Sequence, residues 1–295
     1  MDQFSIHNLR FARLSFFVNR FGTLGRADRL FAGAPEGLML KRTLFGSKMA
    51  CDVSRDGPQR LIYLEGERTI AEADLVLSAL KPNFVAVDVG ANIGYYMLLI
   101  NKGIGAGGRI IAVEPSPENL PELHRTIELN SREHKVTTIH AAVGDAPGQV
   151  YLKRGINSGV SEAADAGYQV RIDTLDNLIE GPVDFLKMDI EGYEGRAIKG
   201  AARILSTFRP VLFLEIHPAT MKTLGDSVEQ LITSLQGLYK SVKFYEIGAE
   251  PTLTRKVLRR YFNVGAISPI DDIDRHLEAA AQSPPEAPFW ALCRN

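Results

Sequence analysis

Acidic and histidine side chains stand at the ends of two apolar segments in the second half of the chain. Asp189 ends one apolar run, and Glu191 follows two residues later. Glu215 and His217 end the next run. If the two runs are neighbouring strands of a parallel sheet, their carboxyl ends open into the same cleft, so we expect these side chains to converge. Lys187 is expected either to face away from Asp189 or to pair with a carboxylate, and no role is assigned to it.

Two kinds of proton chemistry are open to such a set of side chains. Asp189 or His217 could act as a general base and take the proton from a hydroxyl nucleophile. Asp189, Glu215 and His217 could instead hold a divalent cation that lowers the pKa of that hydroxyl. The oxygen-rich ligands would suit Mg²⁺ or Mn²⁺ better than Zn²⁺. In a non-catalytic interpretation, Asp189 only binds the cofactor or caps the following helix, and His217 lies in a structural turn before Pro218.

A loop with two glycines, VGANIG, follows an earlier apolar run that ends in Asp88. Gly90 and Gly94 would let a ligand approach the backbone closely. The next predicted strand ends in Glu114, 20 residues after Gly94. A carboxylate at that place can accept hydrogen bonds from both hydroxyls of a ribose. Both signals indicate a cofactor that contains adenosine.

The identity of that cofactor depends on two side chains of the loop. Proteins that bind NAD prefer the pattern G-x-G-x-x-G, which receives a pyrophosphate at a helix start. Here Asn92 stands where that pattern has its second glycine. Asp88 would repel a pyrophosphate and attract the amino group or the sulfonium of S-adenosylmethionine. The loop therefore favours S-adenosylmethionine over NAD.

Predicted strands and helices alternate from about residue 70 onward. Apolar runs predict strands over residues 84–89, 109–113, 136–143, 185–190, 211–216, 242–247 and 289–293. Helices are predicted over residues 95–100, 117–130, 195–205 and 227–239. Residues 150–153 and 169–172 resemble short extra strands, and residues 266–287 a surface excursion with one short helix. Alternation of this kind indicates an α/β fold with a Rossmann-like, doubly wound parallel sheet.

The composition is that of an ordinary soluble globular protein. The 295 residues are 45% hydrophobic and 23% charged, and the net charge is −1. No basic field of the kind that nucleic-acid binding requires is visible. No apolar stretch approaches a membrane span or a secretory signal, so we expect a cytoplasmic protein. The two cysteines, Cys51 and Cys293, give neither a metal-finger spacing nor a disulfide framework.

The N-terminal region differs from the rest of the chain. Residues 1–45 carry a net charge of +4, and the apolar side chains from Leu9 to Phe17 suggest a basic amphipathic helix. We therefore expect residues 1–60 to form a helical extension that caps the main domain or contacts a second copy in a homodimer. Residues 61–295 are expected to form the main domain.

Several motifs taken together resemble one family. The segments DVGANIG, EP, AVGD, TLD and LKMDIEGYE occur in this order over residues 88–194. They resemble the FkbM-like methyltransferases, and KMDIEGYE following TLD is the most specific of them. The resemblance covers about residues 60–220. It implies a class I, S-adenosylmethionine-dependent methyltransferase with a seven-stranded sheet whose last strand is antiparallel.

The resemblance also assigns residues to the cofactor. The loop after the first strand would line its methionine end, through Asp88, Gly90, Ala91, Asn92 and Gly94. Glu114 would hold the ribose. The backbone of Ala142 and Val143 would approach the adenine. Asn157-Ser158-Gly159 resembles a polar loop that often lies over the site in this family.

The implied reaction is methyl transfer to a hydroxyl of a small molecule, a sugar or glycan, a polyketide or a lipid-linked acceptor. Three alternatives remain open at this point. An N- or C-methyltransferase on the same fold is weakened because the sequence lacks an Asn/Asp-Pro-Pro-Tyr/Phe tetrapeptide. A nicotinamide-dependent dehydrogenase is disfavoured by Asn92 and Asp88. A protein that binds the cofactor without turnover is opposed by the presence of Asp189, Glu215 and His217.

Overall fold

The computed structural model describes residues 37–43, 46–55, 59, 70–130, 135–153, 160–161, 167–248, 266–281 and 287–295. The predicted amphipathic helix near the N-terminus lies outside these residues, as does the loop Asn157-Ser158-Gly159.

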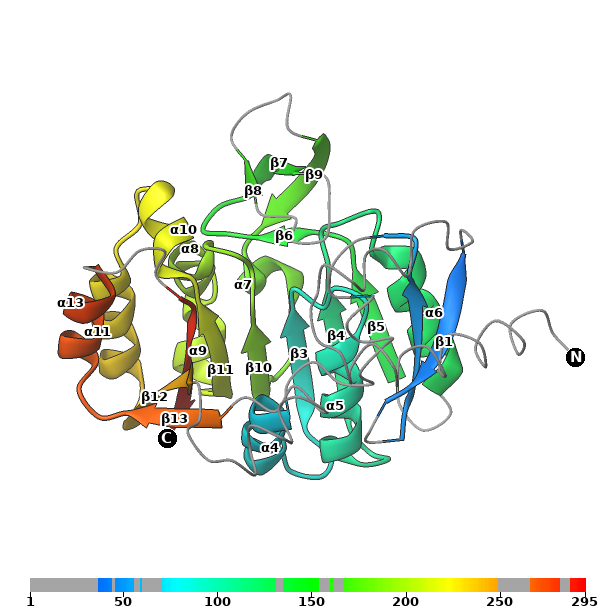
Figure 1. Cartoon of the computed structure of the whole chain (residues 1–295), viewed down its shortest axis with the longest axis horizontal. Coiled ribbons are helices and arrows are strands. Elements are labelled where there is room, and N and C mark those ends of the chain that lie inside the picture. The colour runs from blue at the N-terminus through cyan, green and yellow to red at the C-terminus, as the bar shows by residue number, and fades with distance from the viewer. Residues whose placement is uncertain are drawn as a thin grey trace, which may run out of the picture.

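A central sheet runs through the molecule (Figure 1). Its eight strands have the order β13-β12-β14-β11-β10-β3-β4-β5. The parallel strands are β3 (Val85–Val89), β4 (Arg109–Val113), β5 (Lys135–Ile139), β10 (Phe185–Met188) and β11 (Val211–Ile216). β14 (Phe289–Arg294) is antiparallel to both of its neighbours, β11 and β12 (Ser241–Gly248). The order reverses between β3 and β10, where a ligand site is expected in a doubly wound sheet.

This sheet confirms the predicted Rossmann-like α/β fold. The antiparallel last strand is present as β14, inserted between β11 and β12. The sheet has one strand more than the expected seven, because β13 (Ala266–Ile270) pairs with the outer edge of β12. The sequence predicts a surface excursion with one short helix over residues 266–287. The structure gives that segment a strand followed by α13 (Ile273–Ala281).

Helices cover both faces of the sheet. They are α4 (Ile70–Ala79), α5 (Tyr95–Ile104), α6 (Leu120–Asn130), α7 (Leu175–Leu178), α8 (Glu194–Lys199), α9 (Ala202–Thr207), α10 (Pro218–Thr223) and α11 (Val228–Leu238). Successive strand residues enter different cores, since side chains alternate along a strand. Phe185 and Phe213 pack with α4 and α5, whereas Leu186 and Leu212 pack with α8, α9 and α11. The predicted helix over 195–205 is divided between α8 and α9.

A second, smaller sheet stands above the carboxyl ends of the central strands (Figure 1). Its order is β6-β9-β7-β8, with β6 (Ala142–Val143), β7 (Gly148–Lys153), β8 (Val160–Ser161) and β9 (Gly167–Asp173). The single strand predicted over 136–143 is thus split between β5 of the central sheet and β6 of the small one. The two short extra strands predicted from the sequence are confirmed as parts of β7 and β9.

The described part of residues 1–60 contains a β-hairpin. Its strands are β1 (Leu38–Arg42) and β2 (Lys48–Asp52), paired antiparallel. Met49 and Cys51 are fully buried in the core that also contains α5. The hairpin is therefore packed into the main domain.

The outer edge of β2 is bonded to one face of α6. The backbone N–H groups of alternate residues of β2 donate to side chains that are four residues apart on α6. The pairs are Lys48 N to Asn130 Oδ1 at 2.9 Å, Ala50 N to Thr126 Oγ1 at 3.1 Å and Asp52 N to Glu122 Oε2 at 3.0 Å. The rise of two strand residues, about 6.8 Å, is close to that of four helix residues, about 6 Å, so the two spacings match.

Within the described residues, no helix combines the length and apolar character needed to cross a membrane. Cys51 and Cys293 are both buried free thiols.

Candidate cofactor pocket and acidic cluster

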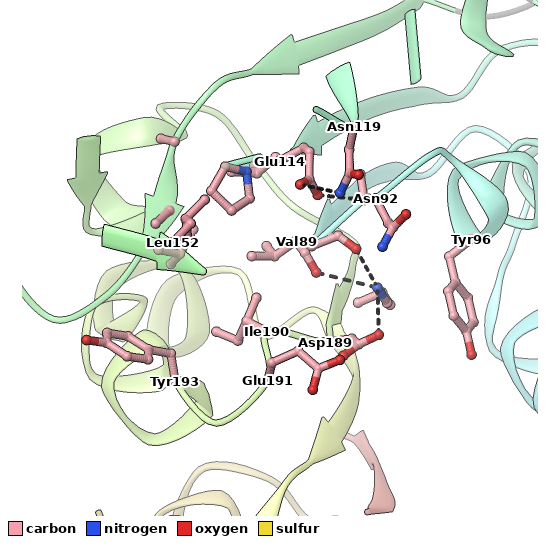
Figure 2. A pocket seen from close by; sticks show the side chains of 18 of the residues that line it. Val89, Asn92, Tyr96, Glu114, Asn119, Leu152, Asp189, Ile190, Glu191 and Tyr193 are labelled. Carbon is pink, nitrogen blue, oxygen red and sulfur yellow. Dashed lines mark hydrogen bonds and ion pairs between the residues drawn. The ribbon is translucent and has the colours of Figure 1, made fainter. Parts of the chain in front are cut away.

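A pocket opens at the carboxyl ends of β3, β4 and β10, below the small sheet. Its lining includes eight of the residues singled out from the sequence: Gly90, Ala91, Asn92, Glu114, Ala142, Val143, Asp189 and Glu191. Four others do not line it: Asp88, Gly94, Glu215 and His217. Figure 2 shows Glu114, Asn92 and Asn119 on one side of the pocket and Asp189, Ile190 and Glu191 on the other.

The two loop glycines are required by the protein's own packing. Gly90 has φ +74°, and a Cβ atom there would lie 1.9 Å from the backbone oxygen of Asp189. Gly94 has φ +96° and begins α5, and a Cβ atom there would lie 3.1 Å from Leu123. Glycine alone combines positive φ with so little space. The sequence predicts these glycines from close approach of a ligand, whereas the structure shows crowding by Asp189 and Leu123.

Glu114 is held in place by three hydrogen bonds. Its Oε2 accepts from the backbone N–H of Asn92 at 2.7 Å. Its Oε1 accepts from the N–H of Ser116 at 2.9 Å and from Nδ2 of Asn119 at 3.0 Å. Burial raises the pKa of Glu114, while these bonds act in the opposite direction. Each carboxylate oxygen has two lone pairs, and both of those on Oε1 are already used, so Glu114 keeps one acceptor position, on Oε2.

Asp88 lies beneath the pocket and not in its wall. Its carboxylate is fully buried, and its Oδ1 lies 3.2 Å from the ammonium of Lys187. Lys187 thus balances the charge of Asp88 inside the protein. The sequence argument that Asp88 attracts the cofactor's positive groups is therefore not supported by the position of this side chain. Glu114 remains as the acidic group of the loop region that faces the cavity.

Lys187 is a pocket residue to which the sequence analysis gave no role. Its ammonium donates to the backbone oxygen of Gly90 at 3.1 Å and lies 4.7 Å from the centre of the Tyr96 ring. Burial acts to lower the pKa of Lys187, but the charges of Asp88, Asp189 and Glu215 raise it. Lys187 is therefore present as the charged ammonium. Of the two expectations stated for Lys187, pairing with a carboxylate is the one found.

Strand register could have revealed this pairing. β3 and β10 are parallel neighbours, and Lys187 stands opposite Asp88 in that pairing. Positions two apart in a strand share a face. Lys187 and Asp189 should for that reason have been placed on the same side, and their side chains lie 3.8 Å apart.

His217 is surrounded by carboxylates. Its Nδ1 lies 2.8 Å from Oε1 of Glu194. Its Nε2 lies 3.6 Å from Glu191, 3.7 Å from Glu215 and 3.9 Å from Asp189. Burial opposes the charged imidazolium, but the hydrogen bond with Glu194 and the nearby negative charges raise the pKa of His217 to about 10.

The three residues predicted to converge at the strand ends are brought together. One ligating atom from each of Asp189, Glu215 and His217 lies within 4.8 Å of the others. A metal ion could bind at this spacing. A proton on Nε2 of His217 could equally occupy the place between the carboxylates. Asp189 belongs to both the pocket and this cluster, so it connects the two. The catalytic role of the three residues stays a prediction.

Comparison with known proteins identifies one family model. Residues 88–240 match the model described as the methyltransferase FkbM domain, which is just over half of the chain. A search of curated proteins gives no match.

Solved structures of methyltransferases show distant similarity. The methyltransferase FkbM from Methylobacillus flagellatus KT is 21% identical, with 64% of this chain and 49% of that chain covered and a TM-score of 0.41. This chain thus spans about half the length of that protein. TYW2 from P. horikoshii, solved in complex with MeSAdo, is 15% identical, with 88% and 70% covered and a TM-score of 0.43. A SAM-dependent O-methyltransferase from Thermotoga maritima is 12% identical, with 90% and 80% covered and a TM-score of 0.40.

Proposed function

Because the chain belongs to the FkbM family of S-adenosylmethionine-dependent methyltransferases, we propose that it transfers a methyl group to a hydroxyl oxygen. The acceptor class we propose is a small molecule, a sugar or glycan, a polyketide-like molecule or a lipid-linked form of these. The observation that carries the proposal is the position of Asp189, whose carboxylate belongs both to the pocket and to the cluster around His217.

The pocket suits an adenosine-containing cofactor. Glu114 lines the cavity and has one acceptor position left, on Oε2, which can accept a hydrogen bond from a ribose hydroxyl. Ala142, Val143 and Leu152 add apolar surface next to it, where an adenine ring could pack. Gly90 and Ala91 also line the pocket, and Gly90 lies against the backbone of Asp189. We propose that these residues hold S-adenosylmethionine, with its ribose at Glu114.

S-adenosylmethionine, when bound, supplies an electrophilic methyl group on a positively charged sulfur. The protein then has to orient the acceptor oxygen in line with that methyl group and take up the hydroxyl proton. Of Asp189, Glu215 and His217, only Asp189 lines the pocket, so its carboxylate is the one that a bound hydroxyl can reach. We propose Asp189 as the proton acceptor, with Glu215 and His217 as its immediate surroundings.

His217 is a poor candidate for the base in the state described. A pKa of about 10 leaves its imidazole protonated at neutral pH, so it has no lone pair to offer a hydroxyl. As an imidazolium, it instead stabilises the surrounding carboxylates. Its contribution would then be electrostatic, through Asp189 and Glu215.

A divalent cation is the second candidate for the same place. Mg²⁺ at Asp189, Glu215 and His217 would replace the proton on Nε2 of His217 and lower the pKa of an acceptor hydroxyl. The hydrogen bond from Nδ1 to Glu194 is the kind of contact that orients metal-binding histidines. The two mechanisms predict opposite effects of a chelator. If Asp189 accepts the proton without a metal, the enzyme keeps full turnover in EDTA. If a divalent cation is required, turnover is lost in EDTA.

The test begins with calorimetric titration of the protein with S-adenosylhomocysteine beside NADH. Binding of the first and not of the second supports the cofactor assignment, and the reverse result contradicts it. Labelled S-adenosylmethionine is then used to screen hydroxylated glycans and polyketides, with and without Mg²⁺ and EDTA. Mass spectrometry and NMR of the product establish whether the methyl group is on oxygen, nitrogen or carbon.

The variant Asp189→Asn separates binding from turnover. We expect it to retain S-adenosylhomocysteine affinity and to lose at least about 100-fold in turnover, the usual contribution of a general base. Glu128→Gln serves as the control, because Glu128 is an exposed carboxylate of α6 paired with Arg125. Unchanged turnover in Asp189→Asn would show that Asp189 is not the proton acceptor.

A further inference from the structure

Arg55 lies outside the matched family domain, yet it reaches Glu114 through one intermediate side chain. Nη2 of Arg55 donates to Oδ1 of Asn119 at 3.0 Å. Nδ2 of Asn119 in turn donates to Oε1 of Glu114 at 3.0 Å. Arg55 follows the β1–β2 hairpin, Asn119 comes just before α6, and Glu114 comes just after β4. A chain of two hydrogen bonds therefore connects the N-terminal hairpin to the pocket.

We propose that Arg55 is a positioning residue for the cofactor ribose, acting through Asn119 on Glu114. The inference rests on the proposed function, because it takes Glu114 as the group that binds the ribose. It gives the N-terminal extension a part in cofactor binding.

The two ends of the Asn119 carboxamide require different hydrogen-bond partners. A carboxamide has one end that donates and one that accepts. The guanidinium of Arg55 can only donate, and an ionised Glu114 can only accept. Asn119 stands between them, so a single orientation satisfies both partners, with oxygen toward Arg55 and nitrogen toward Glu114. Without Arg55, the carboxamide loses the contact that fixes its oxygen, and Glu114 alone holds the amide nitrogen in place.

Arg55 is itself fixed by other contacts. Its Nη1 donates to the backbone oxygen of Glu118 at 2.8 Å and to Oε1 of Glu122 at 2.5 Å. Its side chain is 19% exposed, and that of Glu122 is 2% exposed. The planar guanidinium presents its two nitrogens in fixed directions, one toward Glu122 and one toward Asn119. The single ammonium of a lysine cannot reproduce this pair of contacts.

The bond from Asn119 affects Glu114 in two ways. It is one of the three bonds that favour the ionised carboxylate against its burial. It also holds Oε1 together with the N–H of Ser116, while Asn92 holds Oε2. Loss of the Asn119 bond would therefore weaken the ionised form that accepts ribose hydroxyls and loosen its direction. The expected defect is confined to ligands that carry those hydroxyls.

The experiment measures the affinity of each protein variant for two ligands, one with and one without the ribose hydroxyls. S-adenosylhomocysteine and its 2′,3′-dideoxyribose analogue are titrated calorimetrically into wild type, Arg55→Met, Arg55→Lys and the control Arg125→Met. Arg125 forms an exposed pair with Glu128 on α6, away from the network. We expect Arg55→Met to weaken S-adenosylhomocysteine by about tenfold, the size of one hydrogen bond to a charged group. The dideoxy analogue should bind wild type and Arg55→Met equally.

The lysine variant separates positioning from stability. Arg55→Lys retains a cation beside Glu122, so we expect a thermal midpoint near that of wild type together with the same loss of S-adenosylhomocysteine affinity. Arg125→Met should change neither quantity. If Arg55→Met does not fold, the comparison of the two ligands on Arg55→Lys decides the question by the same criterion.

Two results would overturn the inference. The first is unchanged affinity for S-adenosylhomocysteine in the Arg55 variants. The second is an equal loss for both ligands, which would mean a general structural defect. Failure of the proposed function is a separate outcome, because then wild type itself would not bind S-adenosylhomocysteine.

Discussion

The ammonium nitrogen of Lys187 lies 3.2 Å from Oδ1 of Asp88, and the two side chains are 2% and 0% exposed. They stand opposite each other on the parallel strands β10 and β3. The pair lies directly below the loop that begins with Gly90, whose backbone oxygen also accepts from Lys187. A buried ion pair thus supports the floor of the candidate cofactor pocket.

The first prediction concerns this pair. Lys187→Met should lower the free energy of unfolding by about 3–5 kcal/mol, because it leaves the Asp88 carboxylate buried without a partner. Urea denaturation measures the change. The double variant Asp88→Asn with Lys187→Met should recover part of the loss, since no uncompensated charge remains. Arg125→Met, which breaks an exposed pair, should change the value by less than about 1 kcal/mol.

Protonation of His217 supplies the second prediction. The carboxylates around it raise its pKa from the ordinary 6.5 to about 10. In metal-free protein, NMR of the imidazole should show it protonated at pH 8. Glu194→Gln removes the hydrogen-bonded charge and should lower the pKa. An imidazole that is neutral at pH 8 in chelator would contradict the assignment.

The same raised pKa predicts how stability depends on pH. A group whose pKa is higher in the folded protein stabilises the fold fully below its unfolded pKa, near 6.5, and loses that effect as the pH rises toward 10. The thermal midpoint of wild type should therefore exceed that of His217→Asn most at pH 6. The difference should shrink steadily up to pH 10, since other titrations affect both proteins alike. A constant difference would count against this account.

The fourth prediction compares two glycines with similar φ. Gly90 has φ +74° and a backbone oxygen where a Cβ would lie, whereas Gly105 has φ +67° and open space. Gly105→Ala should lower the free energy of unfolding by about 1–3 kcal/mol, the cost of the backbone conformation alone, since Gly105 has ψ −178°. Gly90→Ala should lose at least about 2 kcal/mol more, because the β3 loop and Asp189 must move apart. Chemical denaturation tests this, and equal losses would show that the crowding is relieved elsewhere.

The bonds between β2 and α6 give the fifth prediction. Thr126 is fully buried and its hydroxyl accepts from the N–H of Ala50. Thr126→Val keeps the shape and removes the acceptor, so it should lower the free energy of unfolding by about 1–3 kcal/mol. The control is Thr223→Val, since Thr223 is exposed. The idea fails if the two valine variants are equally stable.

Much of the central sheet was predictable because most of its strands are local apolar runs, whereas β13 was not predicted. The positions of Asp189, Glu215 and His217 followed from one further rule, that parallel strands end at the same edge. The first step needs no knowledge of which distant segments touch, and the second needs only that these two strands are neighbours.

Features that depend on long-range pairing were missed. The division of residues 136–143 between β5 and β6 is invisible in a run that is uniformly compatible with a strand. Lys187 required the register of β10 against β3, and Arg55 required the hairpin to lie on α6. The explanation for Gly90 required the approach of Asp189 from a strand about 100 residues away in sequence. Local sequence patterns record none of these distances.

The contact between β2 and α6 also limits how the hairpin can associate. A strand at the edge of a sheet normally offers its row of N–H groups to any other strand that passes. In β2 those groups are already taken by Glu122, Thr126 and Asn130. The helix thus acts as a cover that prevents a second chain from extending the hairpin along this side. Two copies that meet at residues 37–55 would have to use side-chain surfaces or the β1 side of the hairpin.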